Sequence, residues 1–347
     1  MCIRDRFELG LALKEERGPE NIFDLSLGNP VMEPPEEFFL ELKELAETKA
    51  KGMHRYMPNA GYPETRQAVA ELLALETGIP YKGANIMMSV GAGGAINVAI
   101  HALVDQGDEV IVFAPYFAEY IFYAHNHYAV PVVVHCNDFF VPDLTDLERK
   151  LTPRTKCVLL NSPNNPAGVV YNEEFLKELA SLLELKAQEF GTEIFIISDE
   201  PYRKLIFDKA VYPFPQHFYQ RTITVTSHSK DLALPGERIG YLAVHPSYPS
   251  AEELMDAMIF CNRVLGFVNA PAIMQHAVKA LQNITIDIGE YQIKRDFLYN
   301  NLKEIGYQVV LPHGAFYMFP KSPTVSYTHL RAHETEADLV CRLLLEK

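Results

Sequence analysis

The residues Ser227–Tyr241 read SHSKDLALPGERIGY and place a lysine, Lys230, directly after a strand-like run. That run, Thr222–Thr226, alternates polar and apolar side chains, as a half-buried strand does. A Pro-Gly turn follows, and Arg238 precedes a second predicted strand at Ile239–Val244. A lysine at the end of a strand is by default a solvated charge. Whether Lys230 has another role depends on what the other strand ends carry.

Short apolar strands alternate with helical segments from about residue 85 to residue 244. Five more strands are predicted at Ile86–Val90, Glu109–Phe113, Val132–His135, Cys157–Leu160 and Ile194–Ile197. Between them, Glu173–Glu189 has apolar side chains at helical spacing. This alternation predicts an α/β fold with a mostly parallel, seven-stranded sheet that helices cover on both faces.

We expect a large domain over residues 49–265 and a smaller α+β domain, to which residues 1–48 and 266–324 contribute. After residue 249 the pattern becomes helical, at Ala251–Val264, Ala272–Leu281 and Asp287–Ile305. Two strands of the smaller domain are predicted at Gln308–Leu311 and Phe316–Phe319.

Composition excludes several classes of protein. The 347 residues carry a net charge of −14, which argues against a nucleic-acid partner, because phosphate binding needs a basic face. No apolar run approaches the roughly 18 residues of a membrane span, and the N-terminus has no signal-peptide core. The five cysteines are scattered without a C-x-x-C pair. We therefore expect a reduced, cytoplasmic enzyme without a metal site or a membrane partner.

The two ends of the chain depart from this pattern. Residues 325–347, and less clearly the opening MCIRDR, resemble peptides translated from sequencing-adapter DNA. We therefore expect residues 325–347 to be non-native and the C-terminal domain to be incomplete. No site residue is assigned in this tail, and that includes Arg331.

A glycine-rich turn, Gly91–Ala95, follows the first predicted strand and opens an apolar helix at Ile96–Val104. Small residues let a ligand approach the backbone, and the free N–H groups at a helix N-terminus attract a phosphate. The alternative is a tight turn that needs glycine for its conformation alone. The segment by itself does not decide between them.

Polar or aromatic residues follow three other strands. Tyr116 could stack on a flat ring, although core packing explains a single tyrosine equally well. The rigid loop Asn161–Gly168 could orient an amide, or its asparagines could only form turns. Asp199 ends an apolar strand, where a buried carboxylate needs a partner. It could cap the next turn or pair with a protonated ligand nitrogen.

Taken in this order and spacing, the motifs resemble those of class I/II aminotransferases, which are fold-type I enzymes that use pyridoxal 5′-phosphate (PLP). The resemblance covers roughly residues 22–323 and is nearest to aspartate-aminotransferase-like members. Its matching segments are Gly91–Ala95, Asn161–Gly168, Asp199–Tyr202 and Ser227–Gly240.

The resemblance implies a role for each matching residue. Lys230 is expected to hold the cofactor as an internal aldimine, and Asp199 to pair with the pyridine nitrogen. Asn165 and Tyr202 are expected to hydrogen-bond the ring hydroxylate, and Tyr116 to stack on the ring. The phosphate is expected to be held by Ala92, Gly93, Gly94, Ser227 and Arg238.

Two further positions and the reaction follow from the same resemblance. Gly28, together with Asn165, is expected near the substrate, and Tyr56 is expected to reach the phosphate of a neighbouring subunit in a homodimer. The implied reaction moves an amino group from an L-amino acid to a 2-oxo acid by a ping-pong mechanism, with Lys230, Asp199 and Tyr202 as the catalytic residues.

The sequence also departs from the family. His228 stands where an aromatic residue is common, and we expect it to pack or hydrogen-bond locally. The arginine that binds the substrate α-carboxylate is not identified, because Arg263 fits a helix-surface charge better. Alternatives remain: a C–S β-lyase on the same scaffold, an inactive truncated fragment, or a non-catalytic PLP-binding module. The last would need room for a basic winged helix, which no segment here offers.

Overall fold

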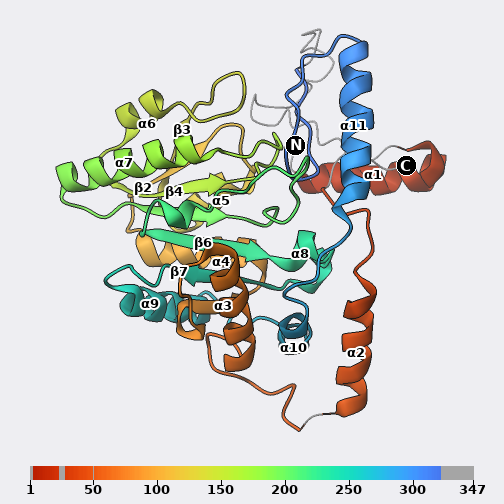
Figure 1. Ribbon diagram of the computed structural model, residues 1–347, viewed down its shortest axis with the longest axis horizontal. Helices are drawn as coiled ribbons and strands as arrows, with labels where there is room; N and C mark the ends of the chain where they lie inside the picture. The colour runs from red at the N-terminus through yellow and green to blue at the C-terminus, as the bar shows by residue number, and fades with distance from the viewer. Residues whose placement is uncertain (1–2, 23–27, 50, 322–347) are drawn as a thin grey trace.

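The computed structural model describes residues 3–22, 28–49 and 51–321, and its centre is one seven-stranded sheet (Figure 1). The strands are β1 (Ile86–Ser89), β2 (Glu109–Phe113), β3 (Val130–Val134), β4 (Thr155–Asn161), β5 (Phe195–Asp199), β6 (Thr222–Ser227) and β7 (Gly240–Val244). They lie in the order β1-β7-β6-β5-β4-β2-β3, and only β7 runs antiparallel to its neighbours. The predicted mostly parallel, seven-stranded sheet is confirmed.

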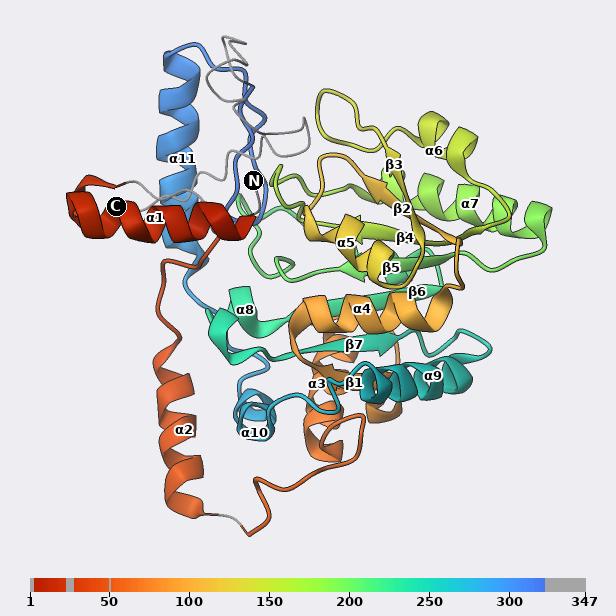
Figure 2. The same cartoon turned by 180° about the vertical axis from the view of Figure 1, so that it is seen from behind.

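Helices cover both faces of the sheet, and the alternation of side chains along each strand explains why. On β2, Val110 and Val112 pack with α4 (Gly91–Leu103), α5 (Glu119–Asn126) and α9 (Ala251–Val264). Ile111 and Phe113 point the other way, into a core with α6 (Leu144–Lys150) and α7 (Glu173–Phe190). A third core on that second face adds α3 (Pro63–Thr77) and α10 (Ala272–Ala280). Figures 1 and 2 view these two layers from opposite sides.

The remaining helices lie beside the sheet or in connections. Helices α1 (Ile3–Arg17), α2 (Glu36–Thr48) and α11 (Ile288–Glu304) are at the right of Figure 1. The short turns are η1 (Pro19–Asn21), η2 (Gly83–Asn85), α8 (His228–Asp231), η3 (Pro215–His217) and η4 (Pro235–Glu237). The predicted C-terminal helices are confirmed, with ends that differ by one residue at most.

The strands predicted at Gln308–Leu311 and Phe316–Phe319 are wrong for the described residues. Gln308 forms only an isolated bridge, to Lys321 beyond the second segment, and an isolated bridge is not a ladder. The intervening backbone bonds to loops of the sheet domain instead. Both His313 N and Gly314 N donate to Gly168 O, at 2.9 and 3.1 Å. The apolar alternation therefore reflects packing on those loops.

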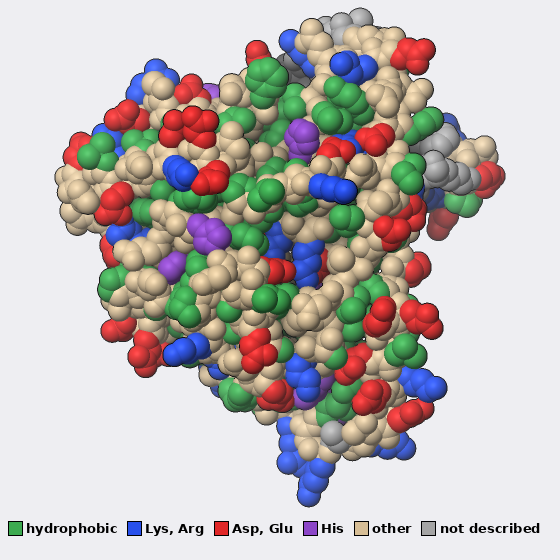
Figure 3. Space-filling model, viewed as in Figure 1, with side chains coloured by type: hydrophobic (Ala, Val, Ile, Leu, Met, Phe, Trp, Pro, Cys, Tyr) green, Lys and Arg blue, Asp and Glu red, His purple; other side chains and the backbone are tan. Residues whose placement is uncertain are grey.

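The surface agrees with the charge composition. On the face shown in Figure 3, Lys and Arg side chains are interspersed with Asp and Glu. Among the described residues, every helix is too short or too polar to cross a membrane.

Candidate active site

A cavity of about 290 Å³ lies where the parallel strands end. This is close to the lower end of the roughly 300–1,000 Å³ that small-molecule sites span. Its walls come from segments far apart in the chain, and these include the ends of β4, β5 and β6 and the start of α4. Predicted site residues that line it are Gly28, Ala92, Gly93, Asn165, Asp199, Tyr202, Ser227, Lys230 and Arg238.

The register of β4 and β5 brings Asn161 and Asp199 side by side at the floor of the cavity. Asn161 Nδ2 donates to Asp199 O at 2.9 Å, and Asn161 Oδ1 accepts from Asn165 N at 2.6 Å. One asparagine side chain thus joins the two strand ends, and it fixes the loop that presents Asn165 to the cavity.

Asp199 is the most unusual group in the site. Its Oδ2 accepts a hydrogen bond from the Tyr120 hydroxyl at 2.5 Å, whereas its Oδ1 has no partner among the described residues. Burial raises the pKa of Asp199 to about 7, and the bond from Tyr120 offsets only part of this. A cationic group placed at Oδ1 would satisfy this oxygen and restore the charged form.

Lys230 reaches the opposite side of the cavity from the short turn α8. Its Nζ donates to Gly28 O at 2.8 Å. The same ammonium group lies 5.1 Å from the ring centre of Phe316 and 5.9 Å from that of Tyr202. The half-buried lysine predicted to be an anchor is thus directed into the cavity.

The glycine-rich turn forms the first turn of α4. Gly91 has φ +67°, a conformation that favours glycine, and a Cβ there would lie 2.8 Å from Arg238 Nη2 and displace the guanidinium. Arg238 Nη1 donates to Pro235 O at 3.0 Å, which directs the guanidinium along the helix N-terminus. Ala92 and Gly93 line the cavity, whereas the predicted Gly94 is buried beneath them. A helix N-terminus beside an arginine suits a phosphate.

Tyr116 is not among the residues that line the cavity, and the adjacent Phe117 is. Phe117 is therefore the aromatic residue of this pair that faces the cavity, and the predicted stacking role of Tyr116 stays a prediction. Tyr56 lies outside this cavity, with 93% of its side chain exposed. Its predicted reach to a neighbouring subunit stays a prediction.

Two tyrosines in the site were missed by the sequence reasoning. The Tyr317 hydroxyl lies 2.8 Å from that of Tyr202 and packs on Gly28, where it leaves no room for a Cβ. Tyr120, which holds Asp199, also meets the Phe117 ring edge to face at 5.5 Å. The run of aromatic residues around Pro115 was a usable signal for Tyr120. No local pattern pointed to Tyr317.

The predicted local role of His228 is confirmed, because its Nδ1 lies 3.2 Å from Asp231 Oδ2 in a buried pair. Arg263 is exposed and donates to Asn59 Oδ1 at 3.2 Å, as expected of a helix-surface charge. Arg331 lies outside the described residues.

Comparison with known proteins defines the class. The family of class I and II aminotransferases matches residues 20–346, and the chain belongs to this family. A probable aspartate aminotransferase from Methanocaldococcus jannaschii is 32% identical over 306 residues, which are 86% of this chain and 77% of that protein. A probable aspartate/prephenate aminotransferase from Thermus aquaticus is 34% identical over 334 residues, 93% of this chain and 83% of that protein.

Solved structures agree. An aminotransferase from Eubacterium rectale has 40% sequence identity and a TM-score of 0.89, over 93% of this chain and 82% of that one. Thermus thermophilus aspartate aminotransferase with maleate has 29% identity and a TM-score of 0.79, over 92% and 82%. The protein is therefore a PLP-dependent transaminase with an aspartate-aminotransferase-like fold.

Proposed function

We propose that the cavity holds PLP with its ring nitrogen at Asp199 and its phosphate at the N-terminus of α4. The unpartnered Oδ1 of Asp199 carries this proposal, because a buried carboxylate with an open oxygen requires a cation. The pyridinium N–H supplies one. Arg238, Ser227 and the backbone of the glycine-rich turn hold the phosphate.

The remaining contacts fix the plane of the ring. Phe117 stacks on one face and is itself supported by Tyr120. Tyr202 and Asn165 bind the ring oxygen, and both line the cavity. The hydroxyl of Tyr317, 2.8 Å from that of Tyr202, keeps the Tyr202 side chain directed at the ring.

Lys230 provides the moving amine. When bound, PLP supplies an electron sink for the carbanion left after an amino acid loses its α-proton. With the cofactor present, Lys230 Nζ would be the group that holds it covalently. The Nζ amine, once free, would serve as the base that takes the proton from the substrate Cα and as the acid that later gives it up. Gly28 O, which accepts from Nζ at 2.8 Å, orients the amine during these transfers.

The reaction proposed is ping-pong transamination from an L-amino acid to a 2-oxo acid. Each half-reaction uses the same Lys230 amine in the opposite direction, so one cavity serves both substrates. Gly28 and Asn165 border the place where the substrate carboxylate is expected.

A product assay tests this reaction against β-elimination. The chain is incubated with PLP, an amino acid and a 2-oxo acid, and in parallel with a cysteine conjugate alone. Transamination predicts a new amino acid that forms only when both substrates are present. Pyruvate and ammonia from the conjugate, without any need for an acceptor, would identify a C–S lyase instead.

We also propose a cytoplasmic homodimer in which Tyr56 completes the neighbouring phosphate site. The exposure of Tyr56, 93%, leaves its hydroxyl available to a second chain. Cys136, Cys157 and Cys261 are free thiols, which suits a reducing compartment. Sedimentation of the PLP-loaded chain measures its oligomeric state, and a dimer is expected. The PLP affinity of Tyr56→Phe, compared with that of wild type, tests whether the Tyr56 hydroxyl contributes to the site.

A further inference from the structure

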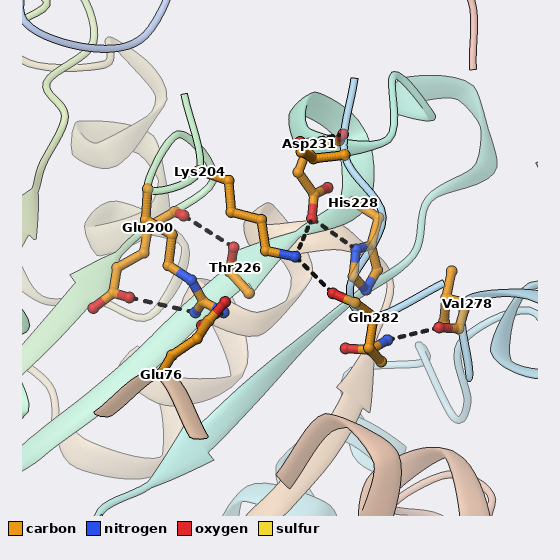
Figure 4. A network of polar contacts seen from close by, with 10 residues as sticks. Glu76, Glu200, Lys204, Thr226, His228, Asp231, Val278 and Gln282 are labelled. Atoms are coloured by element: carbon orange, nitrogen blue, oxygen red, sulfur yellow. Dashed lines mark hydrogen bonds and ion pairs between the residues drawn. The ribbon is translucent and has the colours of Figure 1, made fainter. Parts of the chain in front are cut away.

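A cluster of largely buried charged side chains, which the proposed function does not use, joins the loop after β5 to the turn α8 (Figure 4). Arg203 Nη2 pairs with Glu76 Oε2 at 2.8 Å. Lys204 Nζ lies 3.6 Å from Asp231 Oδ2, and the same oxygen lies 3.2 Å from His228 Nδ1. The Lys204 and Asp231 side chains are only 17% and 10% exposed, so this ion pair is largely shielded from water.

The Lys204–Asp231 pair connects the two segments that carry the main site residues. Lys204 lies two residues after Tyr202 and five after Asp199, in the loop that follows β5. Asp231 directly follows Lys230 in α8. Because α8 has four residues, its own hydrogen bonds do not hold its shape, and tertiary contacts must do so.

Both partners are fixed by further bonds. Lys204 Nζ donates to Gln282 O at 2.8 Å. The backbone carbonyl of Asp231 accepts from Ile286 N at 2.9 Å and from Thr285 Oγ1 at 3.0 Å. The pair is therefore a rigid connection between the loop, α8 and the chain after α10.

The charges in this cluster favour an ionised Asp231. Burial alone would raise the pKa of the Asp231 carboxyl, but the neighbouring His228, Lys204 and Arg203 together lower it below its ordinary value. The other charged groups of this cluster are acidic, and both face Arg203: Glu200 at 3.6 Å and Glu76 at 2.8 Å.

We propose that Lys204 and Asp231 are positioning residues, whose ion pair holds the Lys230 turn in register with Asp199 at the end of β5 and with Tyr202 in the loop that follows it. The inference rests on the proposed role of Lys230. Removing one partner leaves a buried charge without its counter-ion and loosens both segments. A misplacement of about 1 Å at reacting groups can reduce a rate about 100-fold.

The chain contains a matched control. Lys150 Nζ lies 2.6 Å from Asp146 Oδ2 and donates to Val133 O at 2.7 Å, which repeats the pattern of Lys204 away from the cavity. The test compares Lys204→Met and Asp231→Asn, alone and combined, with Lys150→Met and Asp146→Asn. The measurements are the PLP dissociation constant, the pH midpoint of the absorption band of bound PLP, and the melting temperature.

Lys204→Met and Asp231→Asn are each expected to weaken PLP binding about tenfold or more. Both should also shift the pH midpoint of the absorption band of bound PLP. The double variant should lose less than the product of the two single effects, because it leaves no lone charge. Lys204→Arg should restore most of the affinity. The control variants should lower the melting temperature and leave affinity and midpoint at wild-type values.

Hydrogen exchange of the cofactor-free chain separates this inference from the proposed function. Lys204→Met should speed exchange in residues 199–205 and 227–234 together, whereas Lys150→Met should not. If the Lys204 variants match the controls in exchange and in affinity, the positioning role is wrong. If the wild-type chain shows no PLP band that depends on Lys230, the proposed function fails, and the exchange data still decide whether the pair joins the two segments.

Discussion

The two sides of the cavity are built in different ways. One side, here called the sheet wall, comes from the ends of strands, the loops and turn that follow them, and the start of a helix. Its members are Ala92, Gly93, Asn165, Asp199, Tyr202, Ser227 and Lys230. The other side, the cap wall, consists of Gly28, Asn29 and Tyr317 from segments outside any strand or helix. The sheet wall is held by strand register and buried hydrogen bonds, and the cap wall by contacts with the sheet wall.

This difference assigns different tasks to the two walls. The sheet wall offers a carboxylate, an amine and a phosphate site, which are groups that bind the cofactor. The cap wall touches it at two points, Lys230 Nζ to Gly28 O and the pair of Tyr202 and Tyr317 hydroxyls. We therefore expect substitutions in the sheet wall to affect cofactor chemistry, and substitutions in the cap wall to affect substrate binding.

The largest effect is expected for Lys230→Ala. This change removes both the covalent anchor and the amine that transfers the proton, so kcat should fall by about 10⁴-fold or more. Steady-state kinetics with saturating PLP measure the loss. Lys177→Ala, which removes an exposed ion pair with Glu173, serves as the control and should leave kcat unchanged.

Asp199→Asn should reduce kcat by about 10²–10³-fold, because a preorganised charge opposite the ring nitrogen is lost. Glu200→Gln tests whether the fall in kcat requires loss of the carboxyl group that lines the cavity, or follows the loss of any buried carboxyl group nearby. Glu200 is the adjacent buried carboxyl, and burial likewise raises its pKa to about 7. A loss of equal size in both variants would contradict the proposed role of Asp199.

The pH dependence of stability tests the same residue without any substrate. Because burial raises the pKa of Asp199 to about 7, the native cofactor-free chain keeps a proton that the unfolded chain releases near pH 4. The free energy of unfolding should therefore fall, by up to a few kcal/mol, as pH rises from about 4 to 7.

Thermal melting measures this fall. The melting temperature of Asp199→Asn minus that of wild type should be more positive at pH 8 than at pH 5. PLP should remove that difference by pairing with the carboxylate, whereas it should leave the matching difference for Glu200→Gln in place. A stability of Asp199→Asn that follows wild type at every pH would show that the carboxyl is not buried in its neutral form.

Gly28→Ala probes the cap wall. The added methyl group would meet the Tyr317 hydroxyl and separate it from Tyr202, so KM for both substrates should rise about tenfold and PLP affinity should fall by a smaller factor. Gly236→Ala is the control, since nothing lies within 4 Å of the added Cβ. A larger change in PLP affinity than in KM would mean that the two walls do not have separate tasks.

The smallest effect is expected when the aromatic residue proposed to stack on the PLP ring is replaced. Phe117→Leu should weaken PLP binding about three- to tenfold, as the loss of one stacking contact predicts. Tyr116→Leu should leave the PLP dissociation constant within about twofold of wild type. Fluorescence titration with PLP measures both, and the reverse ranking would restore Tyr116 as the stacking residue.

The sheet wall could be predicted from sequence for a physical reason. Parallel strands place their carboxyl ends at one edge, so Asn165, Asp199 and Lys230 had to lie near one another once the strands were recognised. The choice between Tyr116 and Phe117 depends on the rotation of the chain before α5, which the residue types do not specify. We therefore test both positions, Tyr116 from the family resemblance and Phe117 from the lining of the cavity.

The cap wall could not be predicted in the same way. The alternation around Tyr317 was interpreted as a strand, yet the neighbouring backbone bonds to the loops at Gly168 and Leu205. Tertiary packing decides which loops such a segment contacts. The local periodicity of the sequence does not identify those loops. Tyr120 was missed for a related reason. Its role depends on a hydrogen bond to Asp199, which is 79 positions away in the sequence.

The covalent anchor is the claim on which the rest depends. The chain is loaded with PLP, its absorption spectrum is recorded, and the sample is reduced with borohydride before peptide mass mapping. The account predicts an absorption band that reduction abolishes and a pyridoxyl group on the peptide that contains Lys230. A band that survives in Lys230→Ala, or a pyridoxyl group found only on another lysine, would contradict it.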